Sequence, residues 1–227
     1  MVLRLFFAAF AAGIIAGLGV TALQQVTTTP LIHKAETFEK AGARPATGSA
    51  HGHTGAGPAA KNAIERIAYT ALTNIILGVG FALLLVGCFA LYGQPVTGPA
   101  GVLWGLAGFA VFTLGPAAGL PPELPGMAAG ELSGRQVWWL LAAACTAGGL
   151  WLLVLKRSTA AKIGGIALLA MPSIIGAPHP EMPSNAVPPE LASRFAAMSI
   201  IVSAIFWAAL GWLAGTFHQR FAKIGKR

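Results

Sequence analysis

Long apolar runs constrain this chain more than any other feature. Most of them contain at least about 17 residues, which as a helix crosses a hydrocarbon layer of about 30 Å. The chain is 56% hydrophobic and only 10% charged, whereas a soluble domain has about 25% charged residues. We therefore predict an all-α polytopic membrane protein with a single transmembrane domain over residues 1–227. Its six expected spans are Leu3–Val26, Ala63–Tyr92, Gly98–Leu114, Gln136–Leu155, Lys162–Ile175 and Phe195–Phe217.

Two of these runs invite a second interpretation. The first has Arg4 at its start and Val20-Thr21-Ala22 as a passable cleavage site, so a signal peptide is the alternative to a membrane helix. Its apolar stretch is long for a signal peptide, and we favour the helix. The fifth run is short, contains glycine and is interrupted by Met171-Pro172, so its length is marginal for a span.

The charges indicate which side of the membrane each loop faces. With six spans, one side carries eight Lys or Arg residues and no acid, and the other carries seven basic residues and all seven acids. Basic residues in short loops favour the cytoplasmic side. Both termini are therefore predicted inside. Residues 218–227 are expected to form a basic cytoplasmic tail that extends the last helix onto the anionic inner leaflet.

Four of the five histidines fall on the acidic outer side: His33, His51, His53 and His179. Imidazole together with carboxylate is ligand chemistry for cobalt, nickel, zinc or iron more than for magnesium or calcium. Each histidine alone would be an ordinary surface residue. Their gathering on the side that also holds the glutamates predicts a metal-binding outer face.

The first outer loop has two parts. Residues 31–40 are expected to form a short helix with His33 and Glu36 on one face, three residues apart. Residues 41–60 are rich in Gly, Ala, Pro and Thr and are predicted to be a flexible outer loop. This loop contains His51 and His53, which can chelate a soft cation weakly. The alternative is a solvated linker whose histidines are incidental.

The other two outer loops share the tetrapeptide Pro-Pro-Glu-Leu, at residues 121–124 and 188–191. In both loops an arginine opens the next span, and the first loop also ends on a Glu-Arg pair. The chain can therefore be read as three helical hairpins with a common orientation. Internal repeats in transporters usually frame the binding site at their interface.

Proline-rich loops can dip toward the bilayer, because proline has no N–H to leave unpaired. Such a loop would place Glu123, His179 and Glu190 at the mouth of the bundle, where we predict that they bind metal. The alternative for the two glutamates is that each caps a helix or pairs with Arg135 or Arg194.

The interiors of the spans are almost purely apolar. No charged residue lies in the middle of any span, which argues against a transport site built on buried carboxylates. Asn74 either joins helices through hydrogen bonds or lines a path. Cys88 and Cys145 are both expected to be small core residues.

Close helix packing is signalled by glycines four residues apart, which let helix backbones approach one another. They predict tight contacts among the first, third and last spans. The pairs are Gly13 with Gly17, Gly101 with Gly105, and Gly211 with Gly215.

Several function classes are excluded by what the sequence lacks. It has no phosphate-binding glycine loop, no Ser/His/Asp set and no zinc-protease motif, so we do not expect an enzyme. The net charge of +8 falls on one side of the membrane and lacks the aromatic interleaving of nucleic-acid binders. We expect no cofactor beyond a bound or transported divalent metal.

Seven short motifs lie along nearly the whole chain: residues 4–9 (RLFFAA), 28–32 (TTPLI), 35–39 (AETFE), 105–109 (GLAGF), 119–126 (GLPPELPG), 135–139 (RQVWW) and 176–180 (GAPHP). Together they resemble the CbtA family of proposed cobalt transporter subunits. The resemblance implies a bacterial inner-membrane protein tied to vitamin B12 synthesis, which works with a small histidine-bearing membrane partner, CbtB. It implies no ligand set, so the metal ligands named above come from the residues themselves.

Together these features predict a membrane permease subunit for a divalent transition metal, with Co²⁺ taken up for cobalamin synthesis. Its expected partners are the bilayer, the metal ion and a CbtB-like subunit. The alternative is a subunit that transports nothing and scaffolds a larger membrane complex. One observation speaks for that alternative: the spans are apolar and contain no buried series of ionisable residues.

Overall fold

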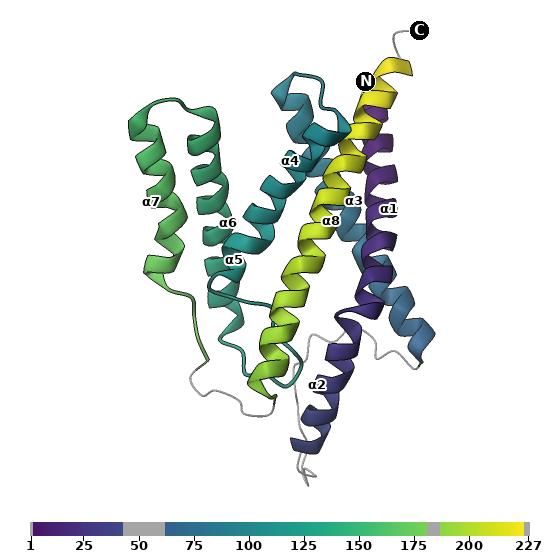
Figure 1. The fold of residues 1–227 in the computed structure, drawn as a ribbon, viewed down its shortest axis with the longest axis vertical. Helices are drawn as coiled ribbons and strands as arrows, with labels where there is room; N and C mark the ends of the chain where they lie inside the picture. Colours follow the sequence, from purple (N-terminus) through teal and green to yellow (C-terminus); the bar gives the residue numbers. More distant parts are fainter. Residues whose placement is uncertain (1, 43–61, 181–186, 225–227) are drawn as a thin grey trace.

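The protein is described here by a computed structural model that covers residues 2–42, 62–180 and 187–224 (Figure 1). These residues form helices and contain no strand, which confirms the all-α prediction. The expected flexible loop at 41–60 lies almost wholly outside the described residues, as do His51 and His53. The helices are α1 (Val2–Val26), α2 (Thr29–Gly42), α3 (Ala63–Tyr92), α4 (Gly98–Phe109), the π-helix η1 (Ala110–Leu114), α5 (Gly115–Ala117), α6 (Leu132–Leu155), α7 (Thr159–Ile175) and α8 (Pro189–Ile224).

Five membrane-length apolar segments lie in the described part of the chain, and they confirm a polytopic membrane fold. They are α1, α3, the continuous segment from α4 to α5, α6 and α8. The fifth expected span, Lys162–Ile175, lies in α7, which is apolar but has only 17 residues. Helix α8 runs on to Ile224, so the tail does extend the last helix as predicted.

Local signals set the helix ends. The Asn62 side chain caps α3 by accepting a hydrogen bond from the Glu65 N–H at 2.8 Å. Gly93 ends the same helix in the left-handed region, at φ 73°, a conformation that glycine adopts without strain. At the start of α6 the Glu131 carboxylate accepts from the Gly134 N–H at 2.9 Å.

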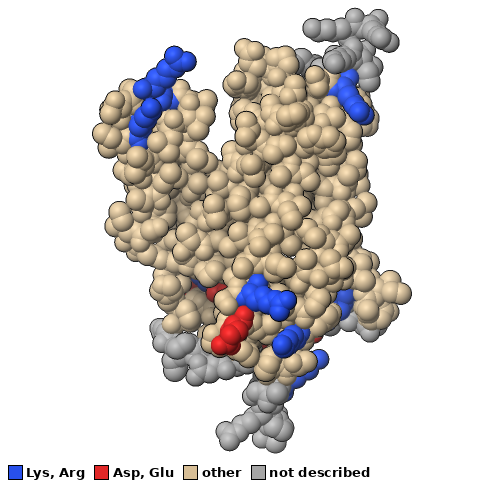
Figure 2. Space-filling model, in the orientation of Figure 1, with Lys and Arg blue, Asp and Glu red and all other residues tan. Residues whose placement is uncertain are grey.

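The two ends of the bundle differ in charge. Figure 1 shows both chain termini at one end, which agrees with an even number of crossings. In the face shown in Figure 2, the visible acidic side chains gather at the opposite end, while basic side chains appear at both. This is the charge partition that the sequence predicts.

The helices do not pair as three consecutive hairpins. Helix α1 packs along α3 and α8, α4 packs along α8, and α6 packs along α7. Helix α1 pairs with α3 as the first expected hairpin, and α6 contacts the third expected span at η1 and at the adjoining α5. Helices α7 and α8 are consecutive in the sequence, yet Figure 1 shows them apart. The third expected hairpin is therefore not a packed pair, because helix surfaces rather than loop similarity determine which helices meet.

Glycine surfaces make the tightest contacts. A Cβ on Gly101 or Gly105 of α4 would collide with the backbone of α8 at Gly211 and Trp207, and a Cβ on Gly215 would lie 2.5 Å from the Thr97 carbonyl oxygen. The predicted contact between the third and last spans is thus confirmed. In α1, Gly13 meets the backbone of α3 at Gly78.

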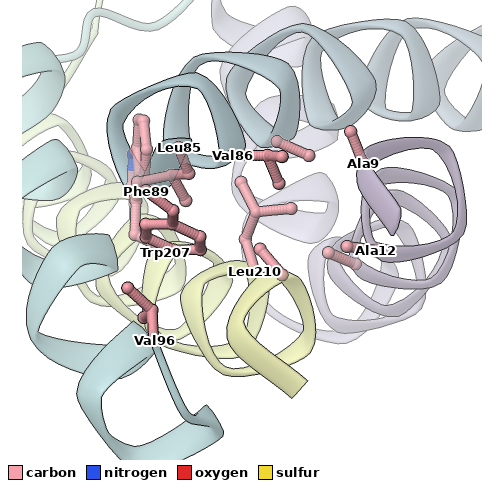
Figure 3. Close-up of a cluster of buried hydrophobic side chains, with 11 residues drawn as sticks. Ala9, Ala12, Leu85, Val86, Phe89, Val96, Trp207 and Leu210 are labelled. Carbon is pink, nitrogen blue, oxygen red and sulfur yellow. The ribbon is translucent and has the colours of Figure 1, made fainter. Parts of the chain in front are cut away.

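The main core lies in the half of the bundle near the termini (Figure 3). Its largest buried side chains include Trp207, Phe89 and Leu210, and alanines of α1 close its other side. Cys145 is buried, as expected, with its Sγ 3.9 Å from Met171 Sδ. Cys88 is exposed on α3 rather than in the core, so that prediction was wrong. A cysteine in an apolar run can equally face the hydrocarbon.

Candidate metal-transport site

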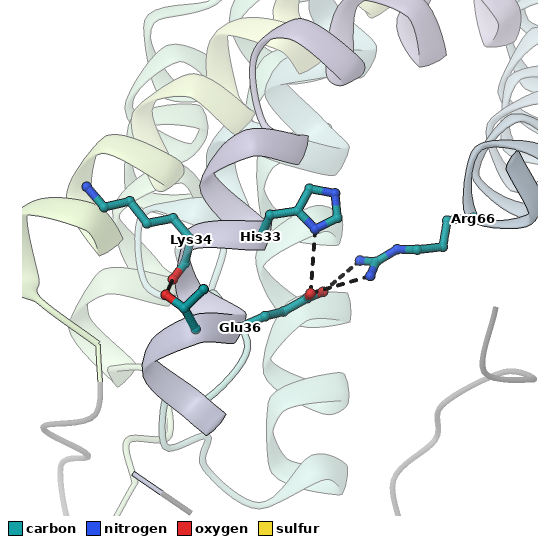
Figure 4. A network of polar contacts seen from close by, with 5 residues as sticks. His33, Lys34, Glu36 and Arg66 are labelled. Carbon is teal, nitrogen blue, oxygen red and sulfur yellow. Dashed lines mark hydrogen bonds and ion pairs between the residues drawn. The ribbon is translucent and has the colours of Figure 1, made fainter. Parts of the chain in front are cut away.

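The first predicted pair, His33 and Glu36, lies on helix α2 (Figure 4). One turn of helix brings His33 Nδ1 to 3.5 Å from Glu36 Oε2, as the spacing predicted. The structure adds Arg66, from the start of α3, whose guanidinium donates to the same carboxylate at 2.6 and 3.4 Å. This contact ties α2 to α3 across the first outer loop.

The Arg66 guanidinium changes what Glu36 can do. It donates to the Glu36 carboxylate and holds the pKa of that carboxyl below its ordinary value of 4.5. Glu36 is therefore anionic at neutral pH, but both of its oxygens already face a cation. An arriving metal ion has to compete with Arg66 for this ligand, whereas the His33 ring is exposed.

The Glu36–Arg66 contact should have a defined pH dependence. Because the folded pKa of Glu36 is depressed, its stabilisation is present above pH 4.5 and is lost as the pH falls through the lower, folded pKa. For a partly exposed pair we expect a contribution of about 0.2–1 kcal/mol. Thermal unfolding of Glu36→Gln against the parent chain should show this difference at pH 7 and not below the folded pKa. Glu39→Gln, an exposed position on the same helix, is the control, and an equal loss there would contradict the assignment.

The second predicted ligand, Glu123, is held by an arginine too. Arg135, in the first turns of α6, donates to Glu123 Oε2 at 2.7 Å, and each side chain is about a quarter exposed. The pair borders a pocket of about 560 Å³ between η1, α5 and α6. Pairing with Arg135 was the alternative role considered for Glu123, and this is the contact that the structure contains.

Two further predicted ligands, His179 and Glu190, are exposed. His179 follows the end of α7, and Glu190 lies in the first turn of α8. Glu190 makes no ion pair with Arg194 in the part of the chain that the structure describes. The two Pro-Pro-Glu-Leu loops therefore differ, since one glutamate is paired with an arginine and the other is free of ion pairs.

Across residues 2–42, 62–180 and 187–224, no three His, Cys, Asp or Glu side chains come together as a group that could hold a metal ion. Within the described residues, the predicted ligands thus occur as one close pair, His33 with Glu36, and as three separate residues, Glu123, His179 and Glu190. Sequence reasoning missed Arg66 as the partner of Glu36. The only signal was charge complementarity between two segments that lie thirty residues apart.

Comparison with known protein families decides the assignment. The family model of CbtA, described as a probable cobalt transporter subunit, matches residues 2–219. The chain belongs to the CbtA family. Neither a curated protein nor a solved structure matches the chain significantly.

Membership of the CbtA family confirms the resemblance seen in the sequence. The family consists of probable cobalt transporter subunits, and this chain has several membrane-length apolar helices. Together these two observations support the conclusion that the chain is a membrane protein with a role in cobalt transport. The word subunit implies partner subunits. A transporter-subunit description also agrees with the expectation that the chain is not an enzyme.

Proposed function

We propose that this CbtA-family chain is the permease subunit of a cobalt uptake system, carrying Co²⁺ across a bacterial inner membrane for cobalamin synthesis. The observation that carries the proposal is the match to probable cobalt transporter subunits over residues 2–219, on a bundle with five membrane-length helices. Both termini are proposed to be cytoplasmic, because the acid-free, basic end is the terminal end. A small histidine-bearing, CbtB-like membrane protein is the proposed partner.

The outer face would collect ions. His33 and His179 present exposed imidazoles, and Glu190 adds a carboxylate without an ion pair in the described residues. His51 and His53, outside the described residues, are proposed to add transient ligands. Imidazole nitrogen suits Co²⁺ better than it suits magnesium or calcium, so this face would discriminate against the more abundant cations.

Two arginines would set the charge of this face. Arg66 holds Glu36 and Arg135 holds Glu123 when no metal is present, so neither carboxylate is left as an unpaired charge. A divalent ion bound at His33 or at the Glu123 pocket can displace a guanidinium and take its carboxylate as a ligand. The metal ion thus takes the place of a guanidinium that remains attached to the protein. The same guanidinium can later displace the metal ion, so binding stays reversible.

The direct test is cobalt uptake by cells that express this chain with and without its small partner. Uptake should rise with the parent chain. It should fall with His179→Ala, by about tenfold at limiting cobalt if His179 supports the entry site as metal-site groups commonly do. Thr37→Ala is the control, because within the described residues this exposed hydroxyl donates only to the Lys34 carbonyl oxygen.

The scaffold alternative makes the opposite prediction. A scaffolding subunit would co-purify with fixed partners, and cobalt uptake would be indifferent to His179→Ala. Uptake that does not change on expression, in membranes shown to contain the folded chain, would end the permease proposal.

A further inference from the structure

A second hollow lies inside the helix bundle, away from the outer-face histidines. It has a volume of about 640 Å³ and is bordered by α1, α3, η1 and α8. We call it the vestibule and define it by six polar side chains that line it: Gln24, Thr73, Asn74, Thr113, Ser199 and Ser203. None of its lining residues is charged. The three long helices around it all belong to membrane-length apolar segments.

Polar lining at this depth requires an explanation. Polar side chains in a membrane protein face the bundle interior or a water-filled cavity, because hydrocarbon offers them no hydrogen bonds. The vestibule also borders a π-helix, η1, which places Thr113 with its Oγ1 3.3 Å from Ser203 Oγ on α8. Single π-helical turns occur frequently at functional sites. The outer end of the vestibule is formed by Thr28, Thr29 and Tyr69, beside the α1–α2 junction.

At Asn74, hydrogen bonds within the protein use both amide hydrogens and leave the carbonyl oxygen. Both N–H groups of Asn74 are used, since Nδ2 donates to Thr21 Oγ1 at 2.9 Å and to Gln24 Oε1 at 2.7 Å. Thr21 and Thr70 donate their hydroxyl hydrogens to backbone carbonyls. Asn74 Oδ1 has no hydrogen bond to it within the described residues. Together with the hydroxyl oxygens of Thr113 and Ser203, Asn74 Oδ1 gives the lining neutral oxygens with free lone pairs.

Such a set suits a cation that keeps its water shell. The waters around a cation point their hydrogens outward, so acceptor oxygens bind them. Six waters occupy about 180 Å³ at about 30 Å³ each, which fits within the hollow with room to spare. Neutral oxygens also bind weakly enough for the ion to leave, as conduction requires.

The vestibule ends on aromatic rings toward the termini. Trp207 is only 2% exposed and packs against Phe81 and Phe112, with ring centroids 4.6 and 5.7 Å away. Beyond them lies the apolar core of Figure 3. The space between these helices is thus polar at the vestibule, and it is packed and apolar beyond the aromatic rings toward the terminal end.

We propose that the vestibule is the intramembrane binding site for a hydrated divalent cation, held by the acceptor oxygens of Gln24, Asn74, Thr113 and Ser203. Taking that cation to be the transported metal rests on the proposed permease function. The outer histidines and carboxylates would then deliver the ion, and the vestibule would hold it within the membrane.

The test places a thiol in the vestibule. Ser199→Cys is made in a Cys88→Ala background, which removes the exposed natural thiol and leaves the buried Cys145. Ile201→Cys is the matched control, two residues along α8, 52% exposed and not part of the vestibule lining. A charged, membrane-impermeant thiol reagent added from outside should label Ser199→Cys roughly tenfold faster than Ile201→Cys, since access by water governs thiolate reactivity.

The second readout uses cobalt alone on the purified variants. Co²⁺ should give a thiolate-to-cobalt charge-transfer absorption band with Ser199→Cys and none with Ile201→Cys. Equal labelling of the two variants would show that the hollow is not open to water, and labelling without the absorption band would show water but no cation site. Either result overturns this proposal. Cobalt uptake by the unaltered chain is measured separately, so the permease function would stand or fall on its own.

Discussion

Replacing Gly105 with leucine is expected to abolish the folded protein. A Cβ at this position would collide with the Trp207 carbonyl oxygen and would lie 3.2 Å from the Gly211 Cα, so α4 and α8 cannot keep their distance. Overpacking costs about 1–3 kcal/mol when side chains can adjust, and we expect at least the upper end here because two helix backbones must separate. Size-exclusion chromatography in detergent should show loss of the monodisperse peak, and thermal unfolding should shift downward.

The matched control is Gly87→Leu on α3. A Cβ there meets nothing within 4 Å, and leucine on this exposed helix surface adds only apolar area. Gly87→Leu should therefore be folded and close to the parent chain in stability. If both variants behave alike, the glycine contact between α4 and α8 does not hold the bundle together.

Trp207→Ala should cause the second large effect. Trp207 stacks on Phe112 with an interplanar angle of 5° and is almost fully buried, so its loss leaves a cavity. We expect a loss of about 3–5 kcal/mol, typical of truncating a buried large aromatic residue. The same cavity would join the vestibule to the space toward the terminal end. Liposomes that contain the variant should therefore admit Co²⁺ faster, as measured with an entrapped dye that the metal quenches.

Trp212→Ala on the same helix is the control, because that indole is 48% exposed. It should cost markedly less stability and should leave Co²⁺ entry unchanged. A Trp207→Ala variant that remains tight to Co²⁺ would mean that the aromatic rings are not the barrier between the two halves of the bundle.

The fold class was predictable because each membrane helix is a local event. Length and hydrophobicity alone identified α1, α3 and α8, and the glycine spacing identified the α4–α8 contact. Which helices become neighbours was not predictable from the loops. The Pro-Pro-Glu-Leu similarity suggested hairpins, but the packing follows the glycine surfaces of non-consecutive helices such as α4 and α8.

For the candidate site, the sequence predicted the types of residue present but not most of the contacts between them. The i, i+3 spacing correctly brought His33 to Glu36, since a single helix determines that distance. The partnership with Arg66 depends on how α2 is placed relative to the start of α3, and no local pattern encodes it. Asn74 was expected either to join helices or to line a path. It joins α1 to α3 through Thr21 and Gln24 and also borders the vestibule.

The shortness of α7 has a consequence for the lipid around it. Its 17 residues rise about 25 Å at about 1.5 Å per residue, roughly 5 Å less than an average hydrocarbon layer. A helix that crosses under this mismatch thins the bilayer next to it, at a cost that grows with the perimeter of the deformed lipid. A second short helix placed beside α7 would share that perimeter and lower the cost. The bilayer itself would thus favour helix association on the α6–α7 side of the bundle.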